Sequence, residues 1–135
     1  MSFHLFFING WGFESNFWKP TCDLLILKDI VSSAKILDKN CLKNNAPKKV
    51  PINTIFITHS MGLNFFLEMK VDCIGLINFF SAPDFLGFQK NFEKFNSLVT
   101  KKHTIKYIPD ASHAYPLNQP NQTAKLIYDF IQSLS

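Results

Sequence analysis

Short apolar runs alternate along this chain with longer segments in which apolar residues recur at helical spacing. The short runs predict strands at about residues 3–9, 34–38, 53–59, 73–80 and 104–108. The helical spacing predicts helices at about residues 15–28, 61–70, 85–99 and 120–134. Strands that alternate with helices are typical of an α/β fold with a parallel sheet and right-handed crossovers. With the strand at 53–59 in the centre, the expected order along the sheet is 2-1-3-4-5.

The strand expected at 53–59 ends in a sequence suited to nucleophilic catalysis, Thr58-His59-Ser60-Met61-Gly62. A serine at the apex of a tight strand-to-helix turn has its hydroxyl clear of the backbone and close to a helix N-terminus. The motif for this turn is Gly-x-Ser-x-Gly, because both outer positions are crowded. Gly62 supplies the second glycine, and the compact but β-branched Thr58 replaces the first. An ordinary strand-to-helix turn is the alternative interpretation.

Two other strand ends carry candidate catalytic groups. The first strand runs into Asn9-Gly10-Trp11-Gly12, and a glycine-rich turn can aim backbone N–H groups at one point, as an oxyanion hole requires. His113 follows the strand expected at 104–108. Because the carboxyl ends of parallel strands meet at one edge of a sheet, we expect Gly10, Ser60 and His113 to lie there together.

An acidic partner for the histidine is expected at Asp84, which follows the apolar run 74–83. A carboxylate at this strand end is suited to orienting a histidine ring. Asp110 is the second candidate, although it is close to His113 in the sequence. The structural alternative for Asp84 is a helix N-cap before Phe85.

These segments, in this order, resemble the α/β-hydrolase superfamily over nearly the whole chain. The turn at Asn9–Gly12 is similar to the His-Gly-x-Gly oxyanion turn, and Thr58–Gly62 is similar to the Gly-His-Ser-Met-Gly elbow. The segment Ile108–His113 resembles the catalytic-histidine loop. Within the superfamily, the Gly-Trp-Gly turn followed by Phe17 and Trp18 most resembles the pimeloyl-[acyl-carrier protein] methyl ester esterases of biotin synthesis.

The resemblance implies a serine carboxylic ester hydrolase in which Ser60 attacks the ester carbonyl, His113 transfers the proton and Asp84 orients His113. No metal or cofactor takes part in such a reaction. The remaining implied site residues are the oxyanion-hole donors Trp11 and Met61, together with Gly10 and His59 at the substrate.

The length of 135 residues and a hydrophobic content of 47% favour a single domain over residues 1–135. Members of the superfamily usually carry an antiparallel N-terminal hairpin and a cap domain, and this chain has room for neither. We therefore expect a minimal three-layer α/β-hydrolase-like sandwich without a cap, and an open active site.

The net charge of +4 comes from dispersed lysines, and the chain contains no arginine. Since arginine is the usual residue for bidentate recognition of nucleic acids, this composition argues against a nucleic-acid-binding protein. A mildly basic surface suits an acidic protein such as an acyl carrier protein, although solvated lysines are the commoner meaning of such a charge.

The three cysteines, Cys22, Cys41 and Cys73, have neither disulfide nor metal-ligand spacing, which favours reduced, mostly buried thiols. The apolar opening lacks the basic region of a signal peptide, and no run approaches the ~20 apolar residues of a membrane span. These features predict a cytoplasmic protein.

The expected function is demethylation of a pimeloyl-acyl-carrier-protein methyl ester, which makes the carrier-bound ester the expected partner. A generic short-chain esterase or thioesterase is the enzymatic alternative. A non-catalytic module that binds an acyl group or a protein is the alternative from another class, favoured by Asn9, by Thr58 and by the missing cap. The oligomeric state stays open.

Overall fold

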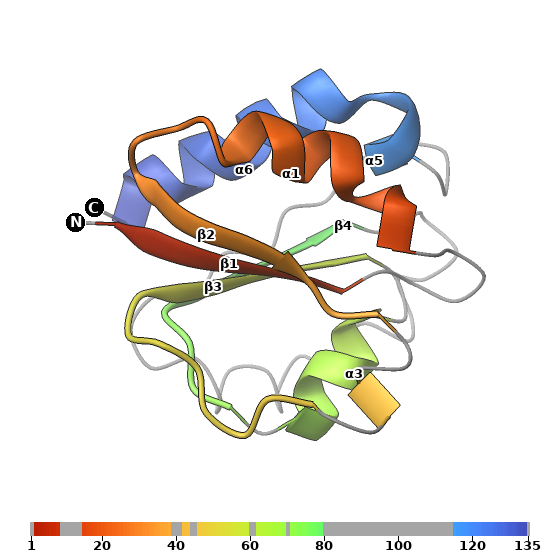
Figure 1. The fold of residues 1–135 in the computed structure, drawn as a ribbon, viewed down its shortest axis with the longest axis vertical. Coiled ribbons are helices and arrows are strands. Elements are labelled where there is room, and N and C mark those ends of the chain that lie inside the picture. Colours follow the sequence, from red (N-terminus) through yellow and green to blue (C-terminus); the bar gives the residue numbers. More distant parts are fainter. Residues whose placement is uncertain are drawn as a thin grey trace.

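A computed structural model describes residues 2–8, 15–38, 42–43, 46–59, 62–69, 71–79 and 115–134. In this part of the chain, one parallel four-stranded sheet lies between two layers of helices (Figure 1). The α/β class, the parallel pairing and the order β2-β1-β3-β4 are as predicted. The fifth predicted strand, at 104–108, lies outside the described residues, as does the helix predicted at 85–99. The strands are β1 (Phe3–Ile8), β2 (Val31–Ile36), β3 (Thr54–His59) and β4 (Gly75–Phe79).

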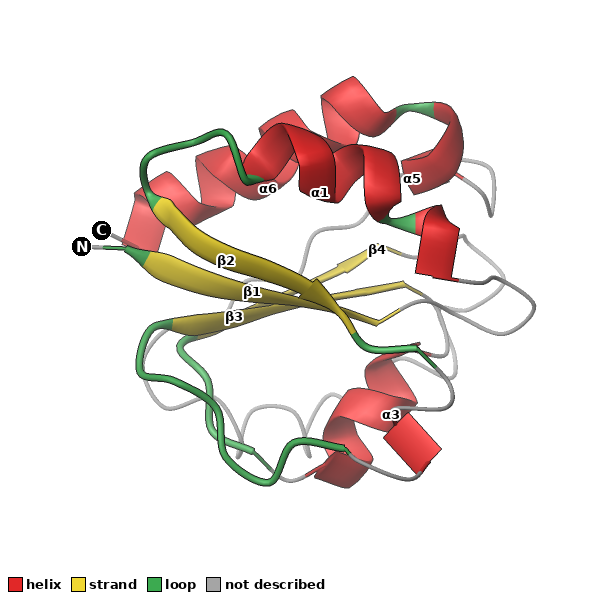
Figure 2. Cartoon of the chain, viewed as in Figure 1, coloured by secondary structure: helices red, strands yellow, loops and turns green. Residues whose placement is uncertain are grey.

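Helices cover both faces of the sheet (Figure 2). The helix α3 (Gly62–Met69) and a short helical segment at 42–43 lie on one face. The opposite face carries the 3₁₀ turn η1 (Ser15–Phe17) and the helices α1 (Lys19–Leu25), α5 (Tyr115–Asn118) and α6 (Pro120–Leu134).

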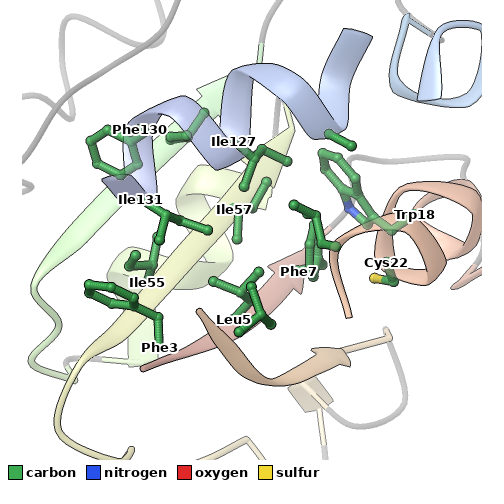
Figure 3. Close-up of a cluster of buried hydrophobic side chains, with 14 of the residues drawn as sticks. Phe3, Leu5, Phe7, Trp18, Cys22, Ile55, Ile57, Ile127, Phe130 and Ile131 are labelled. Atoms are coloured by element: carbon green, nitrogen blue, oxygen red, sulfur yellow. The ribbon is translucent and has the colours of Figure 1, made fainter. Parts of the chain in front are cut away.

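The two central strands, β1 and β3, are almost entirely buried and consist mostly of apolar residues, because both of their faces are covered. Successive side chains of a strand point to opposite faces, so Phe3, Leu5 and Phe7 face α1 and α6, while Phe6 and Ile8 face α3. Figure 3 shows the larger of the two clusters, in which side chains of β1 and β3 meet those of α1 and α6. This double burial fixes which face of the sheet each later residue occupies.

The last helix packs closely on the start of β4. Its apolar positions recur at helical spacing, and Ile127, Phe130 and Ile131 are buried. A Cβ atom at Gly75 would lie 2.9 Å from Cζ of Phe130 and 3.0 Å from Cδ1 of Leu134. Glycine at this position therefore allows α6 to approach the strand.

The position of β2 differs from the prediction, which placed a strand at 34–38. The observed strand begins at Val31 and ends at Ile36. Among the described strands it lies at an edge of the sheet, and only its first residue is buried. Its pairing with β1 includes a hydrogen bond between His4 Nδ1 and Ser33 Oγ, 2.8 Å apart. This polar contact stabilises the first half of β2, which has too few apolar residues to be predicted as a strand.

The helix predicted at 15–28 is also shorter than expected. The 3₁₀ turn η1 precedes α1, which carries a proline in its first turn and ends at Leu25. A missing N–H is tolerated in a first helical turn. Beyond α1, Ile26 and Leu27 are 45% and 78% exposed, and the chain turns at Lys28, whose carbonyl accepts a hydrogen bond from the Val31 N–H. The prediction extended the helix beyond Leu25 because residues 24–27 are apolar, and this extension is wrong. The short α5 was not predicted.

Two of the three cysteines are described, and both are buried thiols that form no disulfide, as predicted. Burial, together with the neighbouring Asp23, raises the pKa of the Cys22 thiol to about 12. Burial likewise raises the pKa of Cys73 to about 12. Cys41 lies outside the described residues. Among the described residues, no helix is long and apolar enough to cross a membrane.

Both buried thiols should resist alkylation in the folded protein. At pH 8 a pKa of about 12 in place of 9.0 lowers the thiolate fraction about a thousand-fold. In a Cys41→Ser variant, native protein should react with an aromatic disulfide reagent at least that much more slowly than protein in denaturant, which should release two equivalents. Rapid reaction of either thiol in the native protein would contradict this burial.

Candidate active site

The carboxyl ends of three neighbouring strands are aligned at one edge of the sheet. In the pairing of β1 with β3, Ile8 is the partner of Thr58. In the pairing of β3 with β4, Thr58 is the partner of Asn78, and His59 is the partner of Phe79. The segments that follow β1, β3 and β4 therefore start side by side.

This edge includes the point at which the chain reverses its direction across the sheet. The chain passes from β1 to β2 on one side, and from β3 to β4 on the other. In open α/β sheets, ligands bind outside the carboxyl ends of the strands at such a switch point. The position between β1 and β3 is therefore the candidate site that topology alone selects.

The strand β3 ends at His59, and α3 begins at Gly62. Only Ser60 and Met61 connect the two elements, and both lie outside the described residues. A two-residue passage from a buried central strand to a helix is the context that the nucleophile elbow requires. The helix has eight residues, with its N-terminus at the carboxyl edge of the sheet.

A buried polar pair lies beneath this connection, on the α3 face of the sheet. The Thr58 hydroxyl donates a hydrogen bond to Oδ1 of Asn78 over 2.8 Å. Thr58 is fully buried, and Asn78 is 1% exposed. Sequence analysis missed Asn78, although a single amide within the apolar run 74–80 was a usable signal, because a buried amide needs a partner.

Aromatic rings cover the opposite face at the same edge. Phe17 lies 4.7 Å from the ring of His59 and 5.1 Å from that of Trp18, measured between ring centroids. Trp18 also contacts Phe7 at 5.1 Å and Phe79 at 6.0 Å. We call these five residues the edge aromatic cluster. It joins the ends of β1, β3 and β4 to the segment that leads into α1.

His59 is the one predicted site residue that the structure describes. It is 2% exposed and packs on Phe17. The sequence predicts that this side chain packs on the substrate pocket or lines it; the contact with Phe17 is a packing contact, and contact with substrate stays a prediction.

The other predicted site residues lie outside the described residues. Described elements nevertheless end or begin a few residues from most of them in the sequence: β1 ends before the glycine-rich turn, β4 ends before Asp84, and α5 begins after the candidate histidine. These undescribed residues are Gly10, Trp11, Ser60, Met61, Asp84 and His113, with the alternative acid Asp110.

No cluster of three or more histidine, cysteine or acidic side chains suited to a metal ion occurs within the described ranges. A shallow groove of about 300 Å³ lies between α1 and α6, where Leu27, Lys28 and Tyr128 contribute to its lining. It is formed by helix surfaces rather than by strand ends, so it is not part of the candidate site.

Comparison of the chain with protein-family models, with curated proteins and with solved structures gave no match.

The burial of Trp18 in the edge aromatic cluster predicts the fluorescence of this residue. Trp18 is fully buried, and its indole N–H has no hydrogen-bond partner among the described residues. In a Trp11→Phe variant, Trp18 is the only remaining tryptophan of two, so emission should be blue-shifted and acrylamide should quench it weakly. Unfolding should shift the emission to the red. Native emission typical of a hydrated indole would contradict the burial of this cluster.

Proposed function

We propose that this chain is a serine carboxylic ester hydrolase built on a minimal α/β-hydrolase-like core. The observation that carries the proposal is the passage from β3 to α3 through Ser60 and Met61 alone, at the switch point of a parallel sheet. In this proposal the undescribed segment 104–108 is a fifth strand beyond β4, and no cap covers the site.

In the proposed mechanism, Ser60 Oγ attacks the ester carbonyl while His113 accepts the hydroxyl proton. His113 then donates that proton to the departing alkoxide, and water hydrolyses the acyl-enzyme by the same route in reverse. Asp84 holds the His113 ring in the required tautomer, with Asp110 as the second candidate for this role. The backbone N–H groups of Trp11 and Met61 stabilise the oxyanion, each contributing roughly 3 kcal/mol to lowering the barrier.

The register of the strands supports this assignment of roles. Because Ile8 and Thr58 are partners, the glycine-rich turn after β1 begins beside the end of β3. Because His59 and Phe79 are partners, the segment that leads to Asp84 begins on the other side of the same strand. The proposed oxyanion donors, nucleophile and acid thus arise from three adjacent strand ends.

The proposed substrate is a pimeloyl methyl ester carried on an acyl carrier protein. The Gly-Trp-Gly turn followed by Phe17 and Trp18 supports this choice by resemblance, and both aromatic residues pack at the candidate edge. An acidic carrier also suits a protein with a net charge of +4. The exposed residues Lys43, Lys48 and Lys49, in the connection between β2 and β3, contribute to that charge.

The central test of this function is the loss of activity on removal of the proposed nucleophile. Ser60→Ala should abolish hydrolysis of p-nitrophenyl esters and covalent labelling by a fluorophosphonate, because no other group then supplies the nucleophile. The melting temperature should change little. A Ser33→Ala variant, altered at the sheet edge formed by β2, is the matched control and should retain both activities. Hydrolysis that survives in Ser60→Ala would place the chemistry elsewhere.

A carrier-bound substrate predicts a strong dependence on salt. Attraction between the lysines and an acidic carrier acts over a screening length of ~30 Å at 0.01 M salt but only ~8 Å at 0.15 M. Cleavage of the pimeloyl-carrier methyl ester should therefore weaken over this range, while turnover of a small neutral ester should barely change.

The same substrate predicts growth without biotin when the chain is expressed in a bacterium that lacks its own pimeloyl-ester esterase. Soluble protein that hydrolyses model esters yet fails both to cleave the carrier-bound ester and to restore growth would favour a generic esterase. Protein that neither hydrolyses esters nor reacts with a fluorophosphonate would favour the non-catalytic binding module.

A further inference from the structure

The hydrogen bond between Thr58 and Asn78 lies where the end of β3 is attached to the end of β4. Each residue is the last but one of its strand, and the two are direct partners in the parallel pairing. The Thr58 hydroxyl is 2.8 Å from Asn78 Oδ1 and 3.5 Å from the carbonyl oxygen of Ile77. Both side chains are buried, so water does not compete for this bond.

In these surroundings, the Thr58 hydroxyl and the Asn78 amide oxygen depend on each other for a hydrogen bond. Around the pair this face of the sheet is apolar, with Ile8 beside Thr58 in the register. The polar residues His4 and Thr54 of the same face lie at the opposite ends of their strands. A hydroxyl and an amide oxygen in such surroundings must find partners within the protein, because an unsatisfied buried polar group is costly. The buried apolar residues of this face include Phe6, Ile8, Phe56, Phe66 and Leu76.

We propose that Thr58 and Asn78 are positioning residues for Ser60. Their hydrogen bond fixes the end of β3 against β4, and so fixes the direction in which the chain enters the two-residue connection to α3. This inference rests on the proposed function, since it concerns the geometry of the proposed nucleophile. It also gives a reason for the departure from the Gly-x-Ser-x-Gly pattern. A glycine at position 58 has no side chain, whereas Thr58 can donate a hydrogen bond to Asn78.

A hydrogen bond of this kind affects reactivity more than its effect on stability suggests. Ser60 is two residues from Thr58 along the chain, so a loosened strand end displaces the nucleophile directly. Misplacement of a reacting group by about 1 Å costs on the order of 10²-fold in rate. If the pair acts only by satisfying two buried polar groups, reactivity should instead follow stability.

Two variants separate these roles. Thr58→Val keeps the β-branched shape but removes the hydroxyl, which leaves Asn78 Oδ1 without its donor. The double variant Thr58→Val with Asn78→Leu removes both polar groups, so neither is left without the other, but it also lacks the hydrogen bond. Thr58→Ser keeps the hydroxyl and is the conservative variant.

Thr54 offers a matched control at the opposite end of the same strand. Its buried hydroxyl donates a hydrogen bond to the carbonyl oxygen of Pro51 over 2.6 Å. Thr54→Val therefore removes a comparable hydrogen bond from β3, but far from the connection to α3. It should lower the melting temperature without changing the reactivity of Ser60.

The experiment measures the second-order rate of fluorophosphonate labelling at Ser60, together with the melting temperature of each variant. We expect labelling to fall roughly 10- to 100-fold in Thr58→Val, and to stay within a few-fold of the wild type in Thr58→Ser and Thr54→Val. The double variant should recover much of the melting temperature lost in Thr58→Val while its labelling stays slow.

The other outcomes are equally definite. A wild-type protein that does not label at all overturns the proposed function, and the positioning role falls with it. A labelled wild type with labelling in Thr58→Val equal to that in Thr54→Val overturns the positioning role alone. The same conclusion follows if the double variant regains both stability and labelling. If Thr58→Val does not fold, the double variant decides by itself, and wild-type labelling in it overturns the proposal.

Discussion

The register of the central strands is the constraint on which the rest of the arrangement depends. Parallel pairing places Ile8, Thr58 and Asn78 in one row across β1, β3 and β4. A shift by one residue would move each side chain of a strand to the other face of the sheet. Since both faces of β1 and β3 are buried, such a shift would exchange two differently packed clusters. Burial thus fixes the register, and the register fixes which segments begin together at the carboxyl edge.

The two faces at this edge differ in chemistry, although they belong to the same strands. On the face that carries α1 and α6, His59 and Phe79 join Trp18 in the edge aromatic cluster. On the α3 face, the neighbouring residues Thr58 and Asn78 form a hydrogen-bonded pair. Because side chains alternate along a strand, Thr58 forms its hydrogen bond on the α3 face, whereas the next residue, His59, packs on Phe17 on the other face. Ser60 follows directly after both.

The sequence predicted the central strands and the last helix well, because these elements depend on burial alone. The strand β3 and the helix α6 have continuous or periodic apolar patterns that few other structures satisfy. The edge strand β2 was displaced in the prediction because polar residues such as Ser33 take part in its pairing. An edge strand needs less apolar burial than a central one, so its pattern is weaker.

The candidate site was less accessible from the sequence than the fold. Motif spacing selected Ser60 and His59, but it gave no indication that Asn78 is the partner of Thr58. That pairing depends on the register of strands separated by about twenty residues, as the Thr58–Asn78 bond spans 20 positions, and no local pattern encodes it. Thr58 departs from the glycine of the motif, and only the structure shows that this threonine has a buried partner in Asn78.

The proposed function requires that the aligned ends of β1 and β3 bring an oxyanion hole to an activated Ser60. A crystal structure of the protein after reaction with a fluorophosphonate tests it most directly. We expect a phosphonyl group bonded to Ser60 Oγ after loss of fluoride, with its P=O oxygen within hydrogen-bond distance of the backbone N–H groups of Trp11 and Met61. An adduct on another residue, or a phosphonyl oxygen directed away from both N–H groups, would contradict it.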